Sequence, residues 1–233
     1  LISKKLLLEE DQSVLDIGCG WGGMAAHIYK KSNANVVGVT LSEEQIAYAQ
    51  ERKIKEKLDK VEYRLQDYRN VNEKYDRIVS VGMFEHVGTA HYQEFFNKVH
   101  DLLNDSGVAL IHTIGRLNEP GNTDPWIDKY IFPGGYIPAL SETVSRVEKS
   151  GLSLTDVQVL RFHYAETLKR WRYNFYDNID KVKEIYDEKF CRMWDFYLSS
   201  SQASFEESTL VVFQMQLSKN KKTVPDSRNY MLT

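Results

Sequence analysis

Short apolar runs and amphipathic stretches alternate along the first half of the chain. The apolar runs predict five strands, at residues 13–18, 35–40, 61–65, 75–81 and 107–114. Apolar residues between these runs recur at helical spacing, which predicts helices at 22–31, 43–57 and 90–103. Strands that alternate with helices in this way form a parallel sheet with helices on both faces, joined by right-handed crossovers.

The second half of the chain departs from this alternation. Residues 117–138 are rich in glycine, proline and aromatic side chains, and we expect an insertion over the carboxyl edge of the sheet. The polar tail, residues 218–233, is expected to be frayed. The other predicted elements are a helix at 141–149, a strand at 152–160, two helices within an aromatic insertion at 164–200, and a last strand at 209–217.

A glycine-rich turn follows the first predicted strand, in the sequence V-L-D-I-G-C-G-W-G-G. Glycine lets the backbone bend sharply and approach a ligand that a Cβ would exclude, and the amides that open the next helix point at that ligand. Gly18, Gly20 and Gly22 are therefore candidates for binding a nucleotide-like cofactor. Their G-x-G-x-G spacing resembles motif I of class I S-adenosylmethionine-dependent methyltransferases. That resemblance implies an α/β fold: a seven-stranded, mostly parallel, doubly wound Rossmann-like sheet in one domain, residues 1–217, with an inserted helical cap.

Polar residues at the ends of the first two strands are further candidates for cofactor binding. Asp16 can face the cationic sulfonium and ammonium groups of the cofactor, or it can orient the amides of the turn. Thr40, Leu41 and Gln45 stand where an acidic residue usually holds the ribose, and both Thr40 and Gln45 can hydrogen-bond hydroxyl groups. Gln45 has an equally good alternative role, in a capping box with Ser42.

The sequence Gln66-Asp67-Tyr68 follows the third predicted strand. A carboxylate at this position can accept a hydrogen bond from an adenine amino group, and an aromatic ring can stack on the adenine. The alternative is an ordinary polar loop. We favour a role in cofactor binding, because the carboxyl ends of parallel strands meet at one edge of the sheet.

An acid and an imidazole at strand ends are the candidates for acid–base chemistry. Glu85 and His86 follow the fourth predicted strand, and their alternative roles are a helix-capping carboxylate and a solvated histidine. His112 lies in the otherwise apolar fifth strand. A lone histidine in a strand usually belongs to the core, but Glu85 on the neighbouring strand end favours a functional pair.

Composition and charge narrow the classes of function. With 30 Lys and Arg against 33 Asp and Glu, the net charge of −3 argues against a general nucleic-acid binder. Cys19 and Cys191 are far apart in the sequence, so we expect neither a disulfide nor a metal site, and a reducing compartment. No apolar run is long enough to span a bilayer. The chain begins with Leu1 rather than methionine, so we expect a longer natural product.

Seven segments together carry a family resemblance. They are V-L-D-I-G-C-G-W-G-G, V-V-G-V-T-L-S-E-E-Q, L-Q-D-Y-R, Y-D-R-I-V-S-V-G-M-F-E-H-V-G, L-I-H-T-I-G, D-P-W-I-D-K-Y-I-F-P-G-G-Y-I-P and H-Y-A-E-T-L-K-R-W. The chain resembles the cyclopropane-fatty-acid synthase family, which includes the mycolic acid cyclopropane synthases. The segments cover nearly the whole chain, and the D-P-W-I…F-P-G-G insertion is the most specific, because other methyltransferases lack it.

The resemblance implies transfer of a methyl group from S-adenosylmethionine to a cis double bond of a phospholipid acyl chain, followed by closure of a cyclopropane ring. Closure requires loss of a proton, for which the family uses bound bicarbonate as the base. By this resemblance, Glu85 and His112 hold bicarbonate through their side chains, Ile114 through its backbone and Tyr164 through its hydroxyl. Phe132 matches an aromatic residue placed near the developing cation, which the face of a ring attracts.

The family also implies a location and a partner. Its substrate is a phospholipid acyl chain, so we expect a cytoplasmic enzyme, peripherally bound to the inner face of the membrane, with a homodimer left open. Lys169, Arg170, Trp171 and Arg172 are candidates for docking on lipid, or form a solvated helix face with one packed ring. A cysteine in an N-terminal Y-x-C-A-Y/W pattern also holds bicarbonate in the family. The 233 residues lack that pattern, and Cys19 belongs to the glycine turn.

Three alternatives remain open. Some relatives methylate the same double bond without closing a ring. Plant amine N-methyltransferases resemble the family and keep an F-E-H segment, in which Glu85 and His86 would orient or deprotonate an amine. A non-catalytic relative would bind only cofactor or lipid. The intact H-T-I-G and F-P-G-G segments favour the cyclopropane synthase, and the presence of both Glu85 and His112 argues against the non-catalytic alternative.

Overall fold

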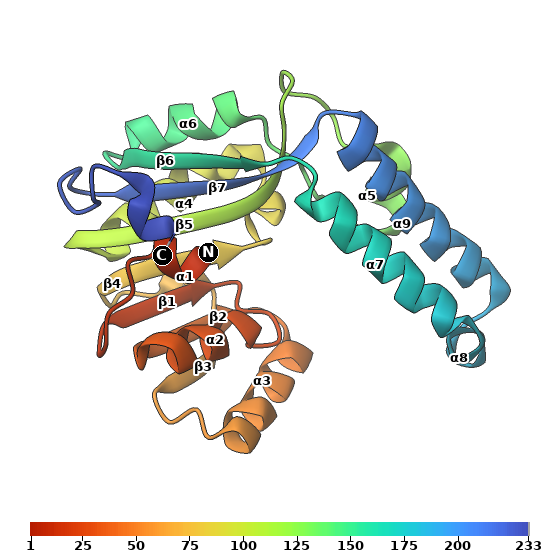
Figure 1. The fold of residues 1–233 in the computed structure, drawn as a ribbon, viewed down its shortest axis with the longest axis horizontal. Coiled ribbons are helices and arrows are strands. Elements are labelled where there is room, and N and C mark those ends of the chain that lie inside the picture. Colours follow the sequence, from red (N-terminus) through yellow and green to blue (C-terminus); the bar gives the residue numbers. More distant parts are fainter. Residues whose placement is uncertain (233) are drawn as a thin grey trace.

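A seven-stranded sheet forms the centre of the computed structural model, which describes residues 1–232 (Figure 1). The strand order is β3-β2-β1-β4-β5-β7-β6, and only β7 runs antiparallel to its neighbours among the described strands. The predicted α/β, mostly parallel sheet is therefore confirmed. The strands are β1 (Ser13–Ile17), β2 (Asn35–Thr40), β3 (Val61–Leu65), β4 (Tyr75–Val81), β5 (Leu103–Arg116), β6 (Ser153–Leu160) and β7 (Leu210–Ser218).

Helices cover both faces of the sheet, and a group of helices extends from one end of it (Figure 1). The α-helices are α1 (Ile2–Lys5), α2 (Gly23–Ser32), α3 (Glu43–Glu56), α4 (Tyr92–Leu102), α5 (Pro125–Tyr130), α6 (Leu140–Lys149), α7 (His163–Asp177), α8 (Ile179–Ile185) and α9 (Glu188–Glu207). Four short 3-10 turns are η1 (Tyr68–Asn70), η2 (Phe84–His86), η3 (Thr89–His91) and η4 (Arg228–Met231).

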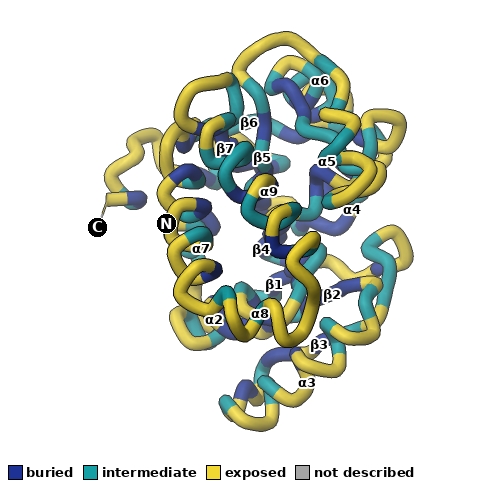
Figure 2. Tube along the Cα trace, turned by 90° about the vertical axis from the view of Figure 1, so that its right-hand side faces the viewer, coloured by how far each residue is buried: buried dark blue, intermediate teal, exposed yellow. Residues whose placement is uncertain are grey.

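Each face of the sheet has its own apolar core. On the α4 side, Phe84 of η2 stacks on Tyr92 with 4.3 Å between ring centroids, and both rings are fully buried. Burying a side chain of this size contributes roughly 1.5–3 kcal/mol, so η2 is held firmly just beyond the end of β4. On the other face, Leu6, Ala25 and Ile28 pack against the sheet. Figure 2 shows buried positions concentrated in the strands and exposed positions along α3, α7 and α8.

The helical cap differs in detail from its prediction. Residues 164–200 fall in three helices rather than two. The first helix is interrupted at Asn178, and Asp187 then caps a further helix by accepting a hydrogen bond from Phe190 N at 2.7 Å. The insertion at 117–138 contains α5, which joins the cap through an edge-to-face contact of Trp126 with Phe196 at 4.7 Å. These helices share an apolar cluster in which Cys191 is buried, as expected for a small core residue.

The expectation of a frayed C-terminal tail is wrong for residues 219–232, whereas Thr233 lies outside the described residues. The tail folds back on β6 and β7 beside α1 (Figure 1). Arg228 donates to Asp156, Tyr230 hydrogen-bonds Gln216, and Met231 is buried. The reason is that Asp156 is a buried carboxylate of β6 and also lies 3.6 Å from the buried ammonium of Lys5. The tail supplies its second cation.

Asp156 is therefore expected to matter more for stability than the residue that reaches it from the tail. Asp156→Asn leaves the fully buried Lys5 without its counter-ion, which should cost about 3 kcal/mol. Arg228→Ala should cost less than about 1 kcal/mol, because the Arg228 side chain is 69% exposed. Urea unfolding of both variants measures the difference. Equal losses would contradict this account of the tail.

Candidate active site

The structure explains in different ways why glycine occupies three positions in the turn after β1. All have positive φ, at 77° for Gly18, 53° for Gly20 and 78° for Gly22. A Cβ on Gly18 would lie 2.7 Å from Met83, and one on Gly22 would lie 2.6 Å from the Tyr63 hydroxyl. A Cβ on Gly20 would meet nothing within 4 Å. Packing therefore explains Gly18 and Gly22, whereas Gly20 faces open space that a ligand can enter.

Asp16 is buried directly before this turn, and one of its carboxylate oxygens has no hydrogen-bond partner. Burial raises the pKa of Asp16 to about 7, against a backbone hydrogen bond from Ala25 that lowers it. One carboxylate contact thus goes to Ala25 of α2, rather than to the turn amides, and Oδ2 remains without a partner. A nearby cation would favour the ionised carboxylate, so the residue suits a cofactor that carries positive charge.

The residues after β2 are organised around Thr40. Its hydroxyl donates to Gln45 Oε1 at 2.8 Å and accepts from Ser42 N at 3.3 Å. Ser42 caps α3 by accepting from Gln45 N, as the capping box predicts, but the Gln45 side chain turns to Thr40 instead of returning to Ser42. Leu41 is 71% exposed. These groups lie at the carboxyl end of β2, as predicted for a ribose site.

The loop after β3 is more self-contained than its sequence indicates. Asp67 accepts from Arg69 N at 2.9 Å and binds the Arg69 guanidinium with both oxygens, which lowers the pKa of Asp67. Gln66 donates to Asn70 O at 3.0 Å, and the Tyr68 ring packs on Phe95 at 5.6 Å. An adenine amino group at Asp67 would therefore share the carboxylate with Arg69, a partner that the sequence analysis missed.

Glu85 is held at the end of β5 by one carboxylate oxygen. Its Oε1 accepts from Ile114 N at 2.6 Å, whereas Oε2 is buried and has no partner. Burial raises the pKa of Glu85, and the hydrogen bond from Ile114 opposes that rise. The backbone N–H of Ile114 is thus engaged by Glu85 itself, and the Ile114 carbonyl accepts from the Thr113 hydroxyl at 3.0 Å. A direct bond from the Ile114 amide to an added anion would require displacing Glu85.

His112 precedes Ile114 by two residues on β5, so the two side chains share a face about 7 Å apart along the strand. Its Nδ1 lies 3.1 Å from Gln214 Nε2 on β7. Burial and then the charge of Lys5 lower the pKa of His112 to about 4. His112 is therefore neutral near pH 7. The described residues show no hydrogen bond between Glu85 and His112, and the contact that relates them is the Ile114 amide, two residues after His112, which donates to Glu85.

Aromatic residues of the cap lie over this strand end. Tyr164 opens α7, and burial together with the negative charge of Glu85 raises its pKa. The Phe132 ring, 43% exposed, makes edge-to-face contacts with His86 at 6.0 Å and Tyr197 at 5.9 Å. Tyr197 is a site residue that the sequence analysis missed, because its place among the aromatics of α9 gave no signal. The structure thus places Tyr164 near Glu85, and Phe132 against His86, the residue that follows Glu85.

Known proteins match nearly the whole chain. The sequence profile of the family described as "Mycolic acid cyclopropane synthetase" matches residues 1–215. "Cyclopropane-fatty-acyl-phospholipid synthase" of Escherichia coli is 40% identical over 219 residues, which are 94% of this chain and 56% of that protein. "Tuberculostearic acid methyltransferase UfaA1" of Mycobacterium tuberculosis is 36% identical over 217 residues, 90% of this chain and 51% of that one. The chain thus spans about half the length of these curated relatives.

The fold matches solved structures equally well. The crystal structure of mycolic acid cyclopropane synthase CmaA1, complexed with SAH and CTAB, superimposes with a TM-score of 0.86 at 32% identity. The match covers 93% of this chain and 81% of that one. The strand order, the glycine turn and the profile match therefore agree, and the chain belongs to the mycolic acid cyclopropane synthetase family of S-adenosylmethionine-dependent methyltransferases.

Proposed function

We propose that this protein methylates a cis double bond of a phospholipid acyl chain and closes a cyclopropane ring, with bicarbonate as the base. The observation that carries the proposal is the buried Glu85 carboxylate, which keeps one oxygen free beneath aromatic residues of the cap. S-adenosylmethionine, when bound, supplies an electrophilic methyl group. The open space at Gly20 and the free oxygen of Asp16 fit its close approach and its positive charge.

The polar groups at the strand end fit an oxyanion that carries a single proton. An ionised Glu85 carboxylate can accept hydrogen bonds but cannot donate them. A tyrosine hydroxyl and the N–H of a neutral imidazole can donate. Tyr164 provides such a donor near the Glu85 carboxylate. His112 provides a second one, two residues before the Ile114 amide that binds Glu85. Bicarbonate has one hydroxyl to donate and oxygens that accept, so one acceptor and two donors match it. These residues would hold the base while the acyl chain loses its proton.

The cap can stabilise a cation and exclude water. Phe132 and Tyr197 present aromatic rings, whose faces attract positive charge. Leu168, Phe175 and Leu198 lie in the same apolar cluster as Tyr197 and are buried. An acyl chain that enters beside this cluster meets an environment as apolar as itself. A carbocation formed there would be protected from capture by water.

Methylation without ring closure is the second candidate, and the relative named "Tuberculostearic acid methyltransferase UfaA1" favours it. Both reactions use the same acceptor and differ in the fate of the cation. Amine N-methylation is less well supported, because the Glu85 carboxylate contacts Ile114 instead of pairing with His86, which is exposed. The three candidates give different products.

Vesicles of a monounsaturated phospholipid, S-adenosylmethionine with a labelled methyl group, and buffers with and without bicarbonate test the proposal. Mass spectrometry of the fatty acids after mild hydrogenation gives the result. We expect a labelled chain that is one methylene heavier and resists hydrogenation, and whose formation falls when bicarbonate is removed. A labelled chain that takes up hydrogen, or a saturated methyl branch, would establish the second candidate. Label found only in an added amine would overturn the proposal.

In the same assay, Glu85→Gln should lower turnover on the order of 10²-fold, the usual contribution of a group that positions a base. His112→Ala should do the same. Affinity for S-adenosylmethionine, measured by calorimetry, should stay within about twofold in both, because neither residue lies in the glycine turn. Glu94→Gln on the exposed surface of α4 is the matched control. Loss of cofactor binding in the Glu85 variant would contradict the assignment of Glu85 to the anion site.

Gly20→Val should weaken S-adenosylmethionine binding at least about tenfold, since the side chain would fill the open space beside the turn. Gly88→Val separates this effect from backbone strain. Gly88 also has a positive φ, of 78°, and a Cβ added there would meet nothing within 4 Å, but it lies outside the turn. It should lose stability and keep its affinity. Calorimetry and thermal unfolding measure both quantities, and equal affinity losses in the two variants would refute the role of Gly20.

We propose that the outer surface of α7 and α8 docks on the membrane that holds the acyl chain. Within residues 1–232, no helix has the length and apolar character that crossing a membrane requires. Lys169, Arg170 and Trp171 are exposed, and α7 and α8 also expose Tyr173, Tyr176 and Ile185. Arg172, the fourth residue of the predicted cluster, turns instead toward α9 and donates to Gln202 at 3.2 Å.

The double variant Trp171→Ser, Tyr173→Ser should reduce the fraction of protein that sediments with anionic phospholipid vesicles about threefold or more, because aromatic rings anchor proteins at the lipid interface. High salt should reduce binding of the native protein as well. Ile54→Ser is the matched control, since Ile54 is 79% exposed on α3, away from the cap. If the control lost as much binding as the double variant, α7 and α8 would not be the docking surface.

A further inference from the structure

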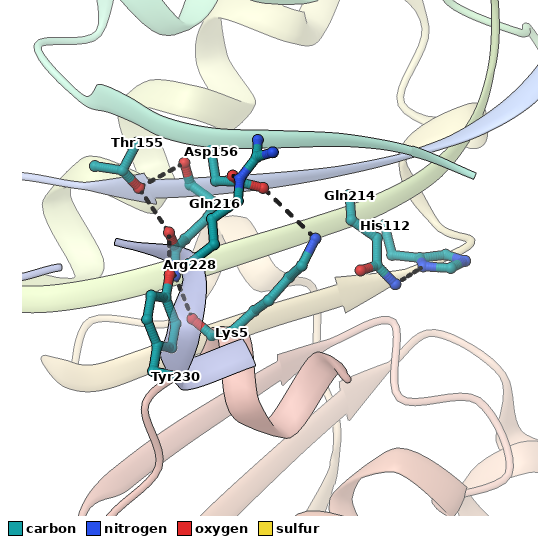
Figure 3. Close-up of polar contacts among 8 residues, drawn as sticks. All are labelled: Lys5, His112, Thr155, Asp156, Gln214, Gln216, Arg228 and Tyr230. Carbon is teal, nitrogen blue, oxygen red and sulfur yellow. Dashed lines mark hydrogen bonds and ion pairs between the residues drawn. The ribbon is translucent and has the colours of Figure 1, made fainter. Parts of the chain in front are cut away.

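A buried polar network extends from His112 toward Lys5 of α1 (Figure 3). It contains Gln214 and Gln216 of β7, Lys5 of α1 and Asp156 of β6. All four residues are at most 8% exposed. The hydrogen bonds and ion pairs described for them join neither the glycine turn nor the aromatic cap. The proposed methyl transfer therefore does not by itself explain why these groups are buried here.

Gln214 is fixed opposite His112 by the register of the sheet. The two residues are direct partners in the antiparallel pairing of β5 and β7, and their side chains meet at 3.1 Å between Gln214 Nε2 and His112 Nδ1. A neutral imidazole carries one N–H, and the partner of the other nitrogen decides where that proton lies. If Gln214 donates to Nδ1, the ring proton must be on Nε2.

Lys5 brings a positive charge near His112, and the Oε1 atom of Gln214 is buried without a hydrogen-bond partner. The Lys5 ammonium is fully buried, has no hydrogen-bond partner, and lies 3.6 Å from Asp156 Oδ1. Figure 3 shows its amino group directed into the region between Asp156 and Gln214, with the Gln214 amide nitrogen turned to His112. An ammonium group can only donate. An amide near it is therefore most stable with its oxygen toward the lysine and its nitrogen toward the ring.

We propose that Gln214 and Lys5 are positioning residues for His112: Lys5 orients the Gln214 amide, and Gln214 holds the neutral imidazole with its proton on Nε2. His112 then always presents a donor, never an acceptor, to the site that Glu85 and Tyr164 share. The inference rests on the proposed function only for the identity of the ligand that this donor binds, a singly protonated oxyanion such as bicarbonate.

The charges around His112 support this role. Asp156 serves two cations, because Arg228 of η4 also donates to it. The charge of Lys5 is therefore only partly compensated by Asp156, which it shares with Arg228. It opposes protonation of His112, whose pKa is lowered by burial and by Lys5, and it favours an anion in front of the ring. A charged imidazole would also bind an anion, but it could give its proton to the bound base. The base could then no longer accept the proton that the acyl chain loses.

The tautomer can be read directly by ¹⁵N NMR of the histidine rings, without lipid or bicarbonate. The chain has six histidines, and the His112 signals are those lost in His112→Ala. In the native protein at pH 7 we expect a neutral ring with the proton on Nε2. In Gln214→Leu, which removes the donor, we expect the proton to be shared between both nitrogens. A native ring protonated on Nδ1, or a Gln214→Leu ring still purely in the Nε2–H form, would overturn the proposal.

Two further variants keep the test decisive. Gln214→Glu replaces the donor by an acceptor of the same length, and should give a ring protonated on both nitrogens at pH 7. It serves if Gln214→Leu fails to fold, and a neutral Nε2–H ring in it would overturn the proposal. Gln158→Leu is the matched control, because Gln158 of β6 pairs with Gln214 from the other side and makes no contact with His112. Its His112 signals should equal those of the native protein.

Activity separates this inference from the proposed function. In Gln214→Leu the bicarbonate concentration that gives half-maximal cyclopropane formation should rise at least tenfold, while KM for S-adenosylmethionine stays unchanged. An unchanged bicarbonate response in a variant with mixed tautomers would overturn the link between the tautomer and the anion site. If the native protein forms no cyclopropane, the proposed function fails, and the NMR result alone still decides whether Gln214 positions the ring.

Discussion

The hydrogen bond from the Ile114 amide to Glu85 is the contact on which the candidate site depends. It joins η2, which follows β4, to the end of β5, and so fixes the acid relative to the strand that carries His112. Phe84, buried beside Glu85, holds η2 from below, and the amide of Tyr136 donates to the Glu85 carbonyl at 2.9 Å from the cap side. The hydrogen bond to Oε1 fixes the position of the carboxylate, and it leaves Oε2 buried without a hydrogen-bond partner. A buried free acceptor is costly, and such a cost is typical of binding sites.

The pairing of β5 with β7 fixes the position of His112 relative to Gln214. His112 and Gln214 are cross-strand partners in β5 and β7, so no side-chain flexibility is needed to bring them together. Burial on this face lowers the pKa of His112 and raises that of Glu85, and both shifts have the same physical cause, the loss of water around a charge. The ring is therefore neutral near pH 7, and the raised pKa makes the ionised Glu85 carboxylate a stronger hydrogen-bond acceptor than an exposed one. The proposed anion site would thus combine weak donors and an acceptor without a strong positive charge in contact.

Features governed by local sequence were predictable, and features that join distant segments were not. The bounds of β2, β3 and β4 follow directly from their apolar runs, and the glycine turn from its spacing. The Asp67–Arg69 contact is local, but the sequence analysis overlooked it because it assigned the Asp67 carboxylate to adenine. The folded tail depends on Asp156, whose burial cannot be seen in a strand that alternates only weakly. The family resemblance placed Glu85, His112 and Tyr164 at one strand end, but not the free Oε2 or the engaged Ile114 amide.

The sheet and the helical cap therefore contribute groups of different chemical character to the candidate site. Strands β1 to β4 end in backbone turns that suit a charged cofactor, and the cap adds aromatic side chains that suit an apolar chain and a cation. These demands conflict, because a water-filled site would quench the cation and a fully apolar one would reject the base. In the proposed function the conflict is resolved where η2 meets β5. There Glu85 is hydrogen-bonded by Ile114 and His112 by Gln214, and each would keep one polar atom for the site. An anion held in this way needs neither bulk water nor an exposed cation.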